Sequence, residues 1–455
     1  MALTGRAALL ALLGTVAVLF APSPASAVAG VALLLLALVA VDLLLAGGVR
    51  GLRFSRAGDR LVRLGETATV ELIVENPGPR RARGVLRDAW PPSAGATPRR
   101  LALDVPPGER RRLVTTLAPT RRGDREAVTV TVRTLGPLGI AGRQGSHRVP
   151  WSVRVLPPFL SRKHLPAKLS RLRELEGRHP SMVRGQGTEF DSLREYVVGD
   201  DVRSIDWRAT ARRDDVVVRT WRPERDRRVL IVLDTGRTSA GRVGTAPIPL
   251  VGETPRGGDL YSGAAVVPGW PRLDWSMDAA LLLAALATRA GDRVDFLAHD
   301  RAVRAWVSGA GRTELLSTLV NTMAPIEAEL IEADSASMVA AVLARAKRRC
   351  LVVVLTDLNA ASLEEGLLPI LPRLSSRHLV LLAAVSDPQV AAMAAGRGTS
   401  ELVYNAAAAE RQNADRRRIT ARLRRHGVEV VDAAPEQIAP ALADAYLALK
   451  AAGRL

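Results

Sequence analysis

The sequence predicts a multidomain membrane protein with an N-terminal transmembrane helical hairpin, an antiparallel β-sandwich and a doubly wound α/β domain. Three observations support this fold class. Two apolar runs open the chain, alternating polar and apolar residues follow from about residue 52, and the last 230 residues alternate short apolar strands with helical patterns. A chain of 455 residues is long enough to bury a separate core in each of these parts.

Residues 1–50 contain the two apolar runs, at about 5–21 and 28–47. A helix needs about 20 apolar residues to cross a bilayer, so the second run is long enough and the first is marginal. Arg6 precedes the apolar residues 7–20 of the first run and Arg50 follows the second run, which predicts a multi-pass protein of the cell membrane with residues after about 50 in the cytoplasm. A cleavable signal peptide ending near Ala27 is the alternative. Asp42 interrupts the second run, as a functional group or as a residue reaching the interface.

Residues 51–158 predict the β-sandwich, because short period-two strands are separated by turn residues such as Asn76-Pro-Gly-Pro. This part contains no pattern typical of catalysis, so we expect it to act as a spacer or to contact a partner. The expected strands cover residues 67–75, 101–105, 111–117, 127–133 and 152–155.

Residues 159–228 form a basic linker followed by a dense polar segment. Leucines recur at helical spacing from Leu165 to Leu175 with basic residues between them, which indicates an amphipathic helix. Such a helix lies on anionic lipid or packs on the neighbouring domain. The formal net charge of the chain is +18, which favours a membrane surface. No nucleic-acid-binding motif accompanies this charge, so we expect no nucleic-acid partner.

Residues 229–455 predict the α/β domain, with a Gly- and Pro-rich insertion at 241–274 after the first strand. The strands are short, apolar and partly β-branched, as buried parallel strands are. They cover residues 229–233, 293–297, 351–355, 378–385 and 428–431. The expected helices cover residues 277–289, 312–323, 335–347, 362–374, 406–425 and 437–451.

The first of these strands ends in Asp234-Thr-Gly-Arg-Thr238. This pattern is similar to the metal-ion-dependent adhesion site of von Willebrand factor type A domains, where an Asp-x-Ser-x-Ser run and later oxygen ligands hold Mg²⁺. Asp357, after a later strand, is in the place of a further ligand, and Asp334 is either a third contributor or a helix cap. Gly236 replaces the middle hydroxyl. The residues therefore predict either a degenerate Mg²⁺ site at Asp234, Thr238 and Asp357 or a hydrogen-bonded remnant of one.

Residues 187–212 carry acids, arginines and aromatics at high density. Phe190, Leu193 and Val197 fit one face of a short helix, which Gly199 would end. A second helical turn is expected after a cap at Ser204 or Asp206. Three carboxylates of this segment are either paired acid–base or metal-binding groups, or part of a salt-bridge lattice with the arginines. They are Asp200, Asp201 and Asp206.

The same segment resembles the signature of domain-of-unknown-function family 58, whose layout includes two N-terminal spans, a β-sandwich and a von Willebrand type A-like domain. The resemblance implies an association with MoxR-type AAA+ ATPases and a role in assembling or maturing protein complexes. The residues that match the signature are Glu189, Phe190, Arg194, Tyr196, Gly199, Asp200, Asp201, Arg203, Asp206, Trp207 and Arg212.

These observations together predict a membrane-anchored cytoplasmic adaptor that binds a protein partner at the carboxyl ends of its strands. No catalytic residues are expected in this interpretation. The alternative is a metal-dependent hydrolase that uses Asp200, Asp201 and Asp206. A surface adhesin would require the opposite membrane topology.

Overall fold

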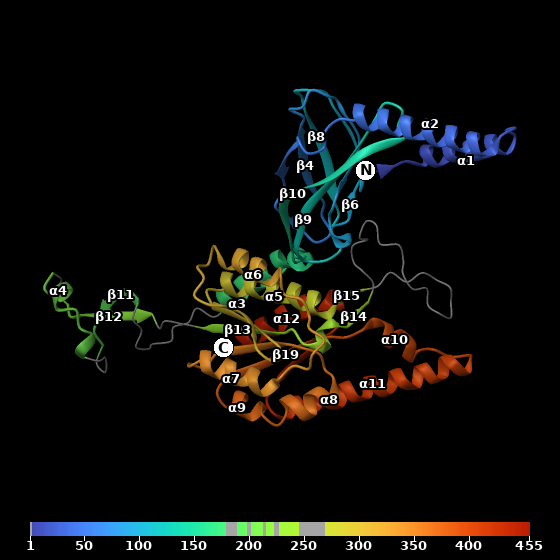
Figure 1. Ribbon diagram of the computed structural model, residues 1–455. Helices are drawn as coiled ribbons and strands as arrows, with labels where there is room; N and C mark the ends of the chain where they lie inside the picture. Colours follow the sequence, from blue (N-terminus) through green and yellow to red (C-terminus); the bar gives the residue numbers. More distant parts are fainter. Residues whose placement is uncertain (1, 179–188, 198–201, 213–214, 223–226, 245–268) are drawn as a thin grey trace. The chain divides into compact units, whose positions relative to one another are not determined.

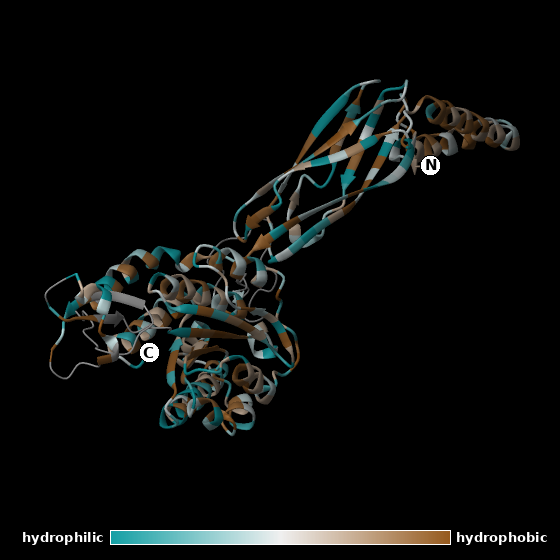
Figure 2. Ribbon diagram, turned by 90° about the vertical axis from the view of Figure 1, so that its left-hand side faces the viewer, coloured by the Kyte–Doolittle hydropathy of each residue, from teal (hydrophilic) through white to brown (hydrophobic). Residues whose placement is uncertain are grey.

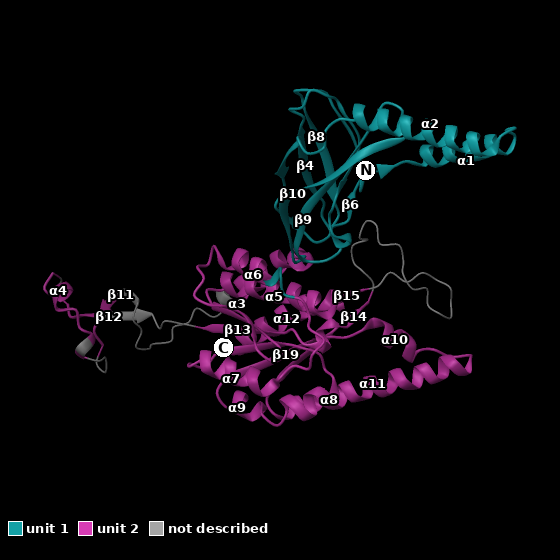
Figure 3. Ribbon diagram, viewed as in Figure 1, with its two compact units in different colours: residues 1–158, 245–268, 323–326 teal, residues 159–244, 269–322, 327–455 magenta. Residues whose placement is uncertain are grey.

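The computed structural model describes residues 2–178, 189–197, 202–212, 215–222, 227–244 and 269–455. These residues form two compact units (Figure 3). Of the described residues, the first unit comprises 2–158 and 323–326, and the second comprises those within 159–244, 269–322 and 327–455.

The chain begins with two antiparallel helices, α1 (Gly5–Leu19) and α2 (Pro24–Leu45) (Figure 1). They touch at Gly14, where an added Cβ would lie 2.5 Å from Cγ1 of Val31. Among the described helices, α2 alone is long and apolar enough to cross a membrane, with a mean hydropathy of 2.8. Its 22 residues extend about 33 Å, whereas the 15 residues of α1 extend about 22 Å. Hydrophobic residues line both helices (Figure 2).

Asp42 near the end of α2 is fully buried and holds the hairpin to the first sheet. Its carboxylate accepts hydrogen bonds from the backbone N–H groups of Leu138, Ile140 and Ala141, at 2.8, 2.7 and 2.8 Å. At the start of α1, the Thr4 hydroxyl donates to the carbonyl of Gly139 at 2.7 Å. The acid in the apolar run is therefore an acceptor for a turn of the β-sandwich, and both hairpin ends are tied to that turn.

Two sheets, mostly antiparallel, follow the hairpin. The strand order is β1-β10-β9-β5-β7, with β3 also paired to β10, in one sheet and β2-β4-β8-β6 in the other. Alternation buries one face of each strand, as in β4, where Ala68, Val70, Leu72 and Val74 are buried. The strands are β1 (Ala2–Leu3), β2 (Arg53–Gly58), β3 (Leu61–Arg63), β4 (Ala68–Glu75), β5 (Ala82–Asp88), β6 (Ala96–Thr97), β7 (Leu101–Val105), β8 (Arg110–Leu117), β9 (Gly123–Leu135) and β10 (Ala141–Leu156).

The second unit begins with the 3₁₀ turn η2 (Leu160–His164) and helix α3 (Leu165–Arg178). Helix α3 packs on helices of its own unit: Leu172 is buried, and Lys168 pairs with Asp444 at 2.7 Å. Of the two interpretations of the basic helix, the structure thus favours packing on the neighbouring domain.

The core of the second unit is a six-stranded sheet in the order β17-β16-β13-β18-β19-β20. All neighbours are parallel except β17, which pairs antiparallel with β16 at one edge. The five parallel strands correspond to the five apolar runs predicted from the sequence. The strands are β13 (Arg228–Asp234), β16 (Arg293–His299), β17 (Val303–Val307), β18 (Leu351–Leu355), β19 (Leu379–Val385) and β20 (Glu429–Ala433).

Helices cover both faces of this sheet (Figure 1). Leu230 and Val232 point to the face where α7, α9 and the end of α11 pack. Helices α5 and α12 pack against each other, and they contact strands β13, β16, β19 and β20 of the sheet. The predicted helix at 362–374 is instead three short pieces. The helices are α5 (Arg272–Arg289), α6 (Leu315–Met323), α7 (Ser335–Arg345), α8 (Ala360–Ser362), the π-helical turn η5 (Leu363–Leu367), α9 (Leu371–Ser375), α10 (Pro388–Ala394), α11 (Ser400–Arg425) and α12 (Pro435–Ala451).

Candidate functional site

The candidate site lies at the carboxyl end of β13, in the middle of the parallel sheet. From β13 the chain moves to β16 on one side and later returns to β18 on the other. Ligands of open α/β sheets bind at such a reversal, outside the carboxyl ends of the strands. Asp234 ends β13 and Thr356 follows β18, so both lie at this point. We call this edge of the sheet the rim.

The carboxylate of Asp234 accepts three hydrogen bonds. Its Oδ1 accepts from the backbone N–H of Gly236 at 2.8 Å, and its Oδ2 accepts from the hydroxyls of Thr356 at 2.6 Å and Thr238 at 3.2 Å. The Ser239 hydroxyl donates to the carbonyl oxygen of Asp234 at 2.7 Å. The structure therefore brings Asp234 and Thr238 together, as the strand-end pattern predicts, and it adds Thr356.

Burial raises the pKa of Asp234, because desolvation disfavours the charged carboxylate. The hydrogen bonds from Thr356, Gly236 and Thr238 act in the opposite direction, and the nearby Asp300 carboxylate adds to the rise. Asp234 is only 6% exposed. It therefore holds the residues of the rim in place from a buried position and presents little charge to solvent.

Gly236 lies against the chain segment that precedes α7. A Cβ added there would come within 3.1 Å of Ile331 O and of the Cβ of Ala333. The Arg237 N–H also donates to Ile331 O at 2.8 Å. A side chain at this position would be crowded by residues 331 and 333, which is a physical reason for glycine in this motif.

A second buried carboxylate, Asp300, lies beside the first, and the sequence interpretation missed it. The Thr235 hydroxyl donates to it at 3.1 Å, and the Arg304 guanidinium pairs with it. Burial disfavours its ionisation, but Arg304 and the N–H groups of Ala302 and Arg301 together lower its pKa. Because Asp300 directly follows β16, the rule that singled out Asp234 at a strand end also applies to it.

Asp357 does not join Asp234. It accepts a hydrogen bond from Arg416 on α11 at 2.8 Å and lies 3.7 Å from the Nε of Arg272. Arg416 also binds Asp432, at 2.7 Å, at the end of β20. No residue spacing links Arg416 with Asp357, so the sequence carried no signal for this pair. Asp334 is the N-cap of α7 and accepts from the N–H of Ser337 at 2.9 Å.

The residues present do not fit a Mg²⁺ site. An octahedral Mg²⁺ site needs free oxygen ligands, whereas both oxygens of Asp234 accept protein hydrogen bonds and Asp357 is paired with arginine. Across the described parts of the chain, no three His, Cys, Asp or Glu side chains gather as a metal ion requires. We therefore derive no chemistry through a metal.

Residues 189–195 of the signature segment form a β-strand, which corrects the helix expected there. Strand β11 (Glu189–Glu195), which includes Phe190 and Arg194, pairs antiparallel with β12 (Val217–Arg222). Tyr196 follows β11, and its N–H donates to Val216 O at 2.8 Å. The helical interpretation failed because the partner strand, apolar at Val217 and Val218, was overlooked.

The turn after this strand is as expected, and Asp206 is its cap. Its carboxylate accepts from the N–H groups of Arg208 and Ala209, both at 3.0 Å, at the start of α4 (Trp207–Thr210). Trp207 and Arg212 are exposed. Arg203 lies in the 3₁₀ turn η3 (Val202–Ser204), and Gly199, Asp200 and Asp201 lie outside the described residues.

Helix α11 meets the rim at Arg416, and its amino-terminal half, farther along the helix, exposes large apolar side chains. Tyr404 is 77% exposed and Val403 52%. In this half, Ala406 and Ala409 are buried, and the principal contacts are with α10. The carboxyl-terminal half differs, because Ile419 and Leu423 are buried in the sheet core.

A family model described as "Protein of unknown function DUF58" matches residues 192–247 and 272–429. No curated protein matches the chain. Three solved structures show weak similarity, each over 23% of this chain: a PapD-like domain of human CEP192, a β-glucosidase from Listeria innocua and a FixG-related protein from Vibrio parahaemolyticus. Their identities are 13%, 14% and 14%, their TM-scores 0.17, 0.16 and 0.16, and the shares of their own lengths 84%, 16% and 96%.

Proposed function

Because this chain belongs to the DUF58 family, whose function is unknown, we propose from its site that it is a membrane-anchored adaptor that binds a protein partner at the rim. The observation that carries the proposal is the polar rim at the sheet reversal, flanked by the exposed apolar residues of α11. Exposed apolar patches rimmed by polar residues are typical of protein-binding surfaces.

The groups at the rim favour binding over catalysis. The hydroxyls of Thr238 and Thr356 both donate to Asp234, and the Ser239 hydroxyl donates to a backbone carbonyl. The Asp234 carboxylate that accepts the threonine hydroxyls is only 6% exposed, which leaves a substrate little access to it. The hydroxyls therefore fix the shape of the rim. We propose that this domain is von Willebrand type A-like and that its partner is a MoxR-type AAA+ ATPase or a client of one.

The N-terminal hairpin supports membrane anchoring. Leu33, Leu36 and Phe20 are 73%, 69% and 84% exposed, an arrangement that costs free energy in water and is favourable in lipid. We propose that α1 and α2 both enter the membrane and that everything after about residue 50 is cytoplasmic. A retained hairpin is consistent with the hydrogen bonds that tie Thr4 and Asp42 to the same turn.

The alternative hypothesis, a metal-dependent hydrolase, requires free carboxylates in the signature segment. Asp206 instead accepts two backbone N–H groups as a helix cap. The other two, Asp200 and Asp201, lie outside the described residues. The described residues therefore support the adaptor hypothesis more directly than the hydrolase hypothesis.

The adaptor proposal is tested by capturing partners from detergent extract with matched charge reversals. Arg237→Glu alters an exposed rim residue, and Arg348→Glu alters an exposed residue at the opposite, amino-terminal edge of the sheet. We expect the first variant to lose partners identified by mass spectrometry with the wild type, and the second to keep them. Equal recovery from both variants, or a reporter fused after Leu455 that reads outside the cell, would contradict the proposal.

A further inference from the structure

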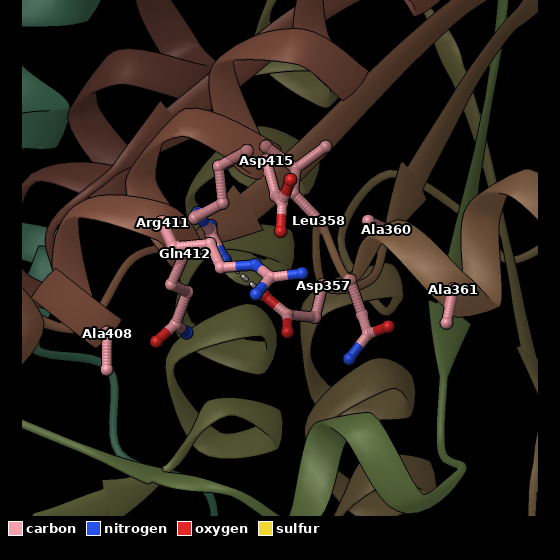
Figure 4. A pocket seen from close by; sticks show the side chains of 10 residues that line it. Asp357, Leu358, Ala360, Ala361, Ala408, Arg411, Gln412 and Asp415 are labelled. Carbon is pink, nitrogen blue, oxygen red and sulfur yellow. Dashed lines mark hydrogen bonds and ion pairs between the residues drawn. The ribbon is translucent and has the colours of Figure 1, made fainter.

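The structure contains a pocket of about 430 Å³ beside the rim, between the turn after β18 and helix α11. Asp357, Leu358, Ala360 and Ala361 line one side, and Ala408, Arg411 and Gln412 line the other (Figure 4). Small alanine side chains on both walls leave the space open. Apolar residues (Leu358 and the alanines) and polar or charged residues both line the pocket, and such a mixture can orient a polar ligand.

Arg411 is the free cation of this pocket. No described residue forms a hydrogen bond or ion pair with it, whereas the other pocket guanidinium, Arg416, binds two carboxylates. Gln412 beside it is exposed and offers an amide N–H. A guanidinium and an amide at one wall suit a carboxylate, which accepts charge-assisted hydrogen bonds from both.

Tyr404 extends the pocket along α11. Residues 404, 408, 411 and 415 are spaced by four, three and four, so they share one helix face. Tyr404 is therefore one turn, about 6 Å, beyond Ala408 of the pocket wall. Tyr404 and Arg411 are seven residues apart, about 10.5 Å along the helix, so a ligand with a carboxylate at Arg411 meets the exposed aromatic ring about three residues farther along an extended segment.

The surroundings favour a protein segment over a phosphate polymer. The carboxylates of Asp415 and Asp357 line the same pocket and repel any anion, so a single carboxylate at Arg411 is favoured over a run of consecutive phosphates. The exposed ring of Tyr404 on the pocket face favours an apolar residue in the ligand. The net charge of +18 also attracts an acidic partner.

We propose that this pocket, together with Tyr404, binds an acidic segment of a partner protein, in which one glutamate or aspartate pairs with Arg411 and an apolar side chain about three residues away packs on Tyr404. The inference rests on the proposed function, because it specifies the chemistry of the partner at the rim. In this proposal α11 recognises the charge of the partner, and Asp234 with Thr238 and Thr356 fixes the shape of the rim.

The experiment selects binders from a random heptapeptide library displayed on phage, with the full chain held in lipid nanodiscs. Wild-type protein should enrich peptides in which an apolar residue stands about three residues from a Glu or Asp. Arg411→Glu should lose this acidic enrichment and bind the wild-type-selected peptides at least about tenfold more weakly. Arg425→Glu makes the same charge change on the same helix outside the pocket, and it should select as the wild type does.

Three results would overturn the inference. They are no acidic enrichment by the wild type, equal selection by Arg411→Glu, or Arg411-dependent binding of a 20-nucleotide single-stranded DNA without peptide selection. The two proposals remain distinguishable. If Arg411→Glu selects as the wild type but rim-dependent capture of cellular partners persists, only the pocket fails. If selection depends on Arg411 but capture does not depend on the rim, only the adaptor function fails.

Discussion

Asp42 in the first unit and Asp234 in the second are both buried, and each accepts three hydrogen bonds, one on Oδ1 and two on Oδ2. They differ in their donors. All three donors to Asp42 are backbone N–H groups, which cannot reverse direction. Two of the three donors to Asp234 are threonine hydroxyls, which can donate or accept by rotating. The first carboxylate is therefore a fixed support, and the second belongs to an adaptable cluster at the rim.

The largest effect is expected where a carboxylate depends on a charge. Arg416→Met leaves Asp357 and Asp432 close together without the cation that pairs with both. We expect a loss of about 3 kcal/mol or more in the free energy of unfolding, measured by denaturant unfolding of the full chain. Arg418→Met is the control, because Arg418 is exposed on the same helix and its ion pairs contribute about 1 kcal/mol at most. Similar losses in both variants would contradict this.

Asp278 tests whether backbone donors always keep a carboxylate charged. It accepts from the N–H of Ser161 at 3.1 Å, yet burial raises its pKa to about 6. The folded state therefore binds a proton more tightly than the unfolded state does. Its contribution to stability is present below about pH 4 and is lost as the pH rises through about 6, by roughly 2–3 kcal/mol. Asp278→Asn should remove this slope in unfolding measured from pH 4 to 8. The same slope in the variant would refute the assignment.

Asp42→Asn should destabilise the first unit by about 2 kcal/mol. The amide places an NH₂ group against at least one backbone N–H of Leu138, Ile140 or Ala141, which is then left unsatisfied. Hydrogen–deuterium exchange should be faster in the peptide that contains these residues. Unchanged exchange there would show that the turn does not depend on the carboxylate.

Asp234→Asn should cost less than about 1 kcal/mol. The amide oxygen keeps the Gly236 N–H, and the NH₂ group donates to Thr238 and Thr356 once their hydroxyls rotate. The raised pKa of Asp234 agrees with a site that tolerates a neutral side chain. The same denaturant experiment checks this value, and a loss as large as that of Asp42→Asn would remove the contrast between the two sites.

The parallel strands could be predicted from the sequence because buried β-branched runs have few alternatives. Leu351–Leu355 has the predicted bounds. The edge strand β17 (Val303–Val307) was not predicted, because it is short and contains Arg304, whereas the buried strands are uninterrupted apolar runs. The helix expected at 362–374 is interrupted by the π-helical turn η5.

The candidate site was predictable only where its residues follow one strand. Asp234 and Thr238 are four residues apart and meet directly. The partner of Asp357 is 59 residues away on α11, and such a pairing depends on how helices pack. The role of Asp42 could not be predicted for the same reason, because the N–H groups that bind it lie about 100 residues later in the chain.

The most direct test of the adaptor is site-specific photocross-linking in living cells. A photoreactive amino acid replaces Arg237 or Glu332, which are exposed at the rim, or Arg348 at the opposite edge as a control. We predict that both rim positions form a discrete adduct with one cytoplasmic protein and that the control position does not. An adduct from Arg348 alone, or none from either rim position, would contradict the proposal that the rim binds a partner.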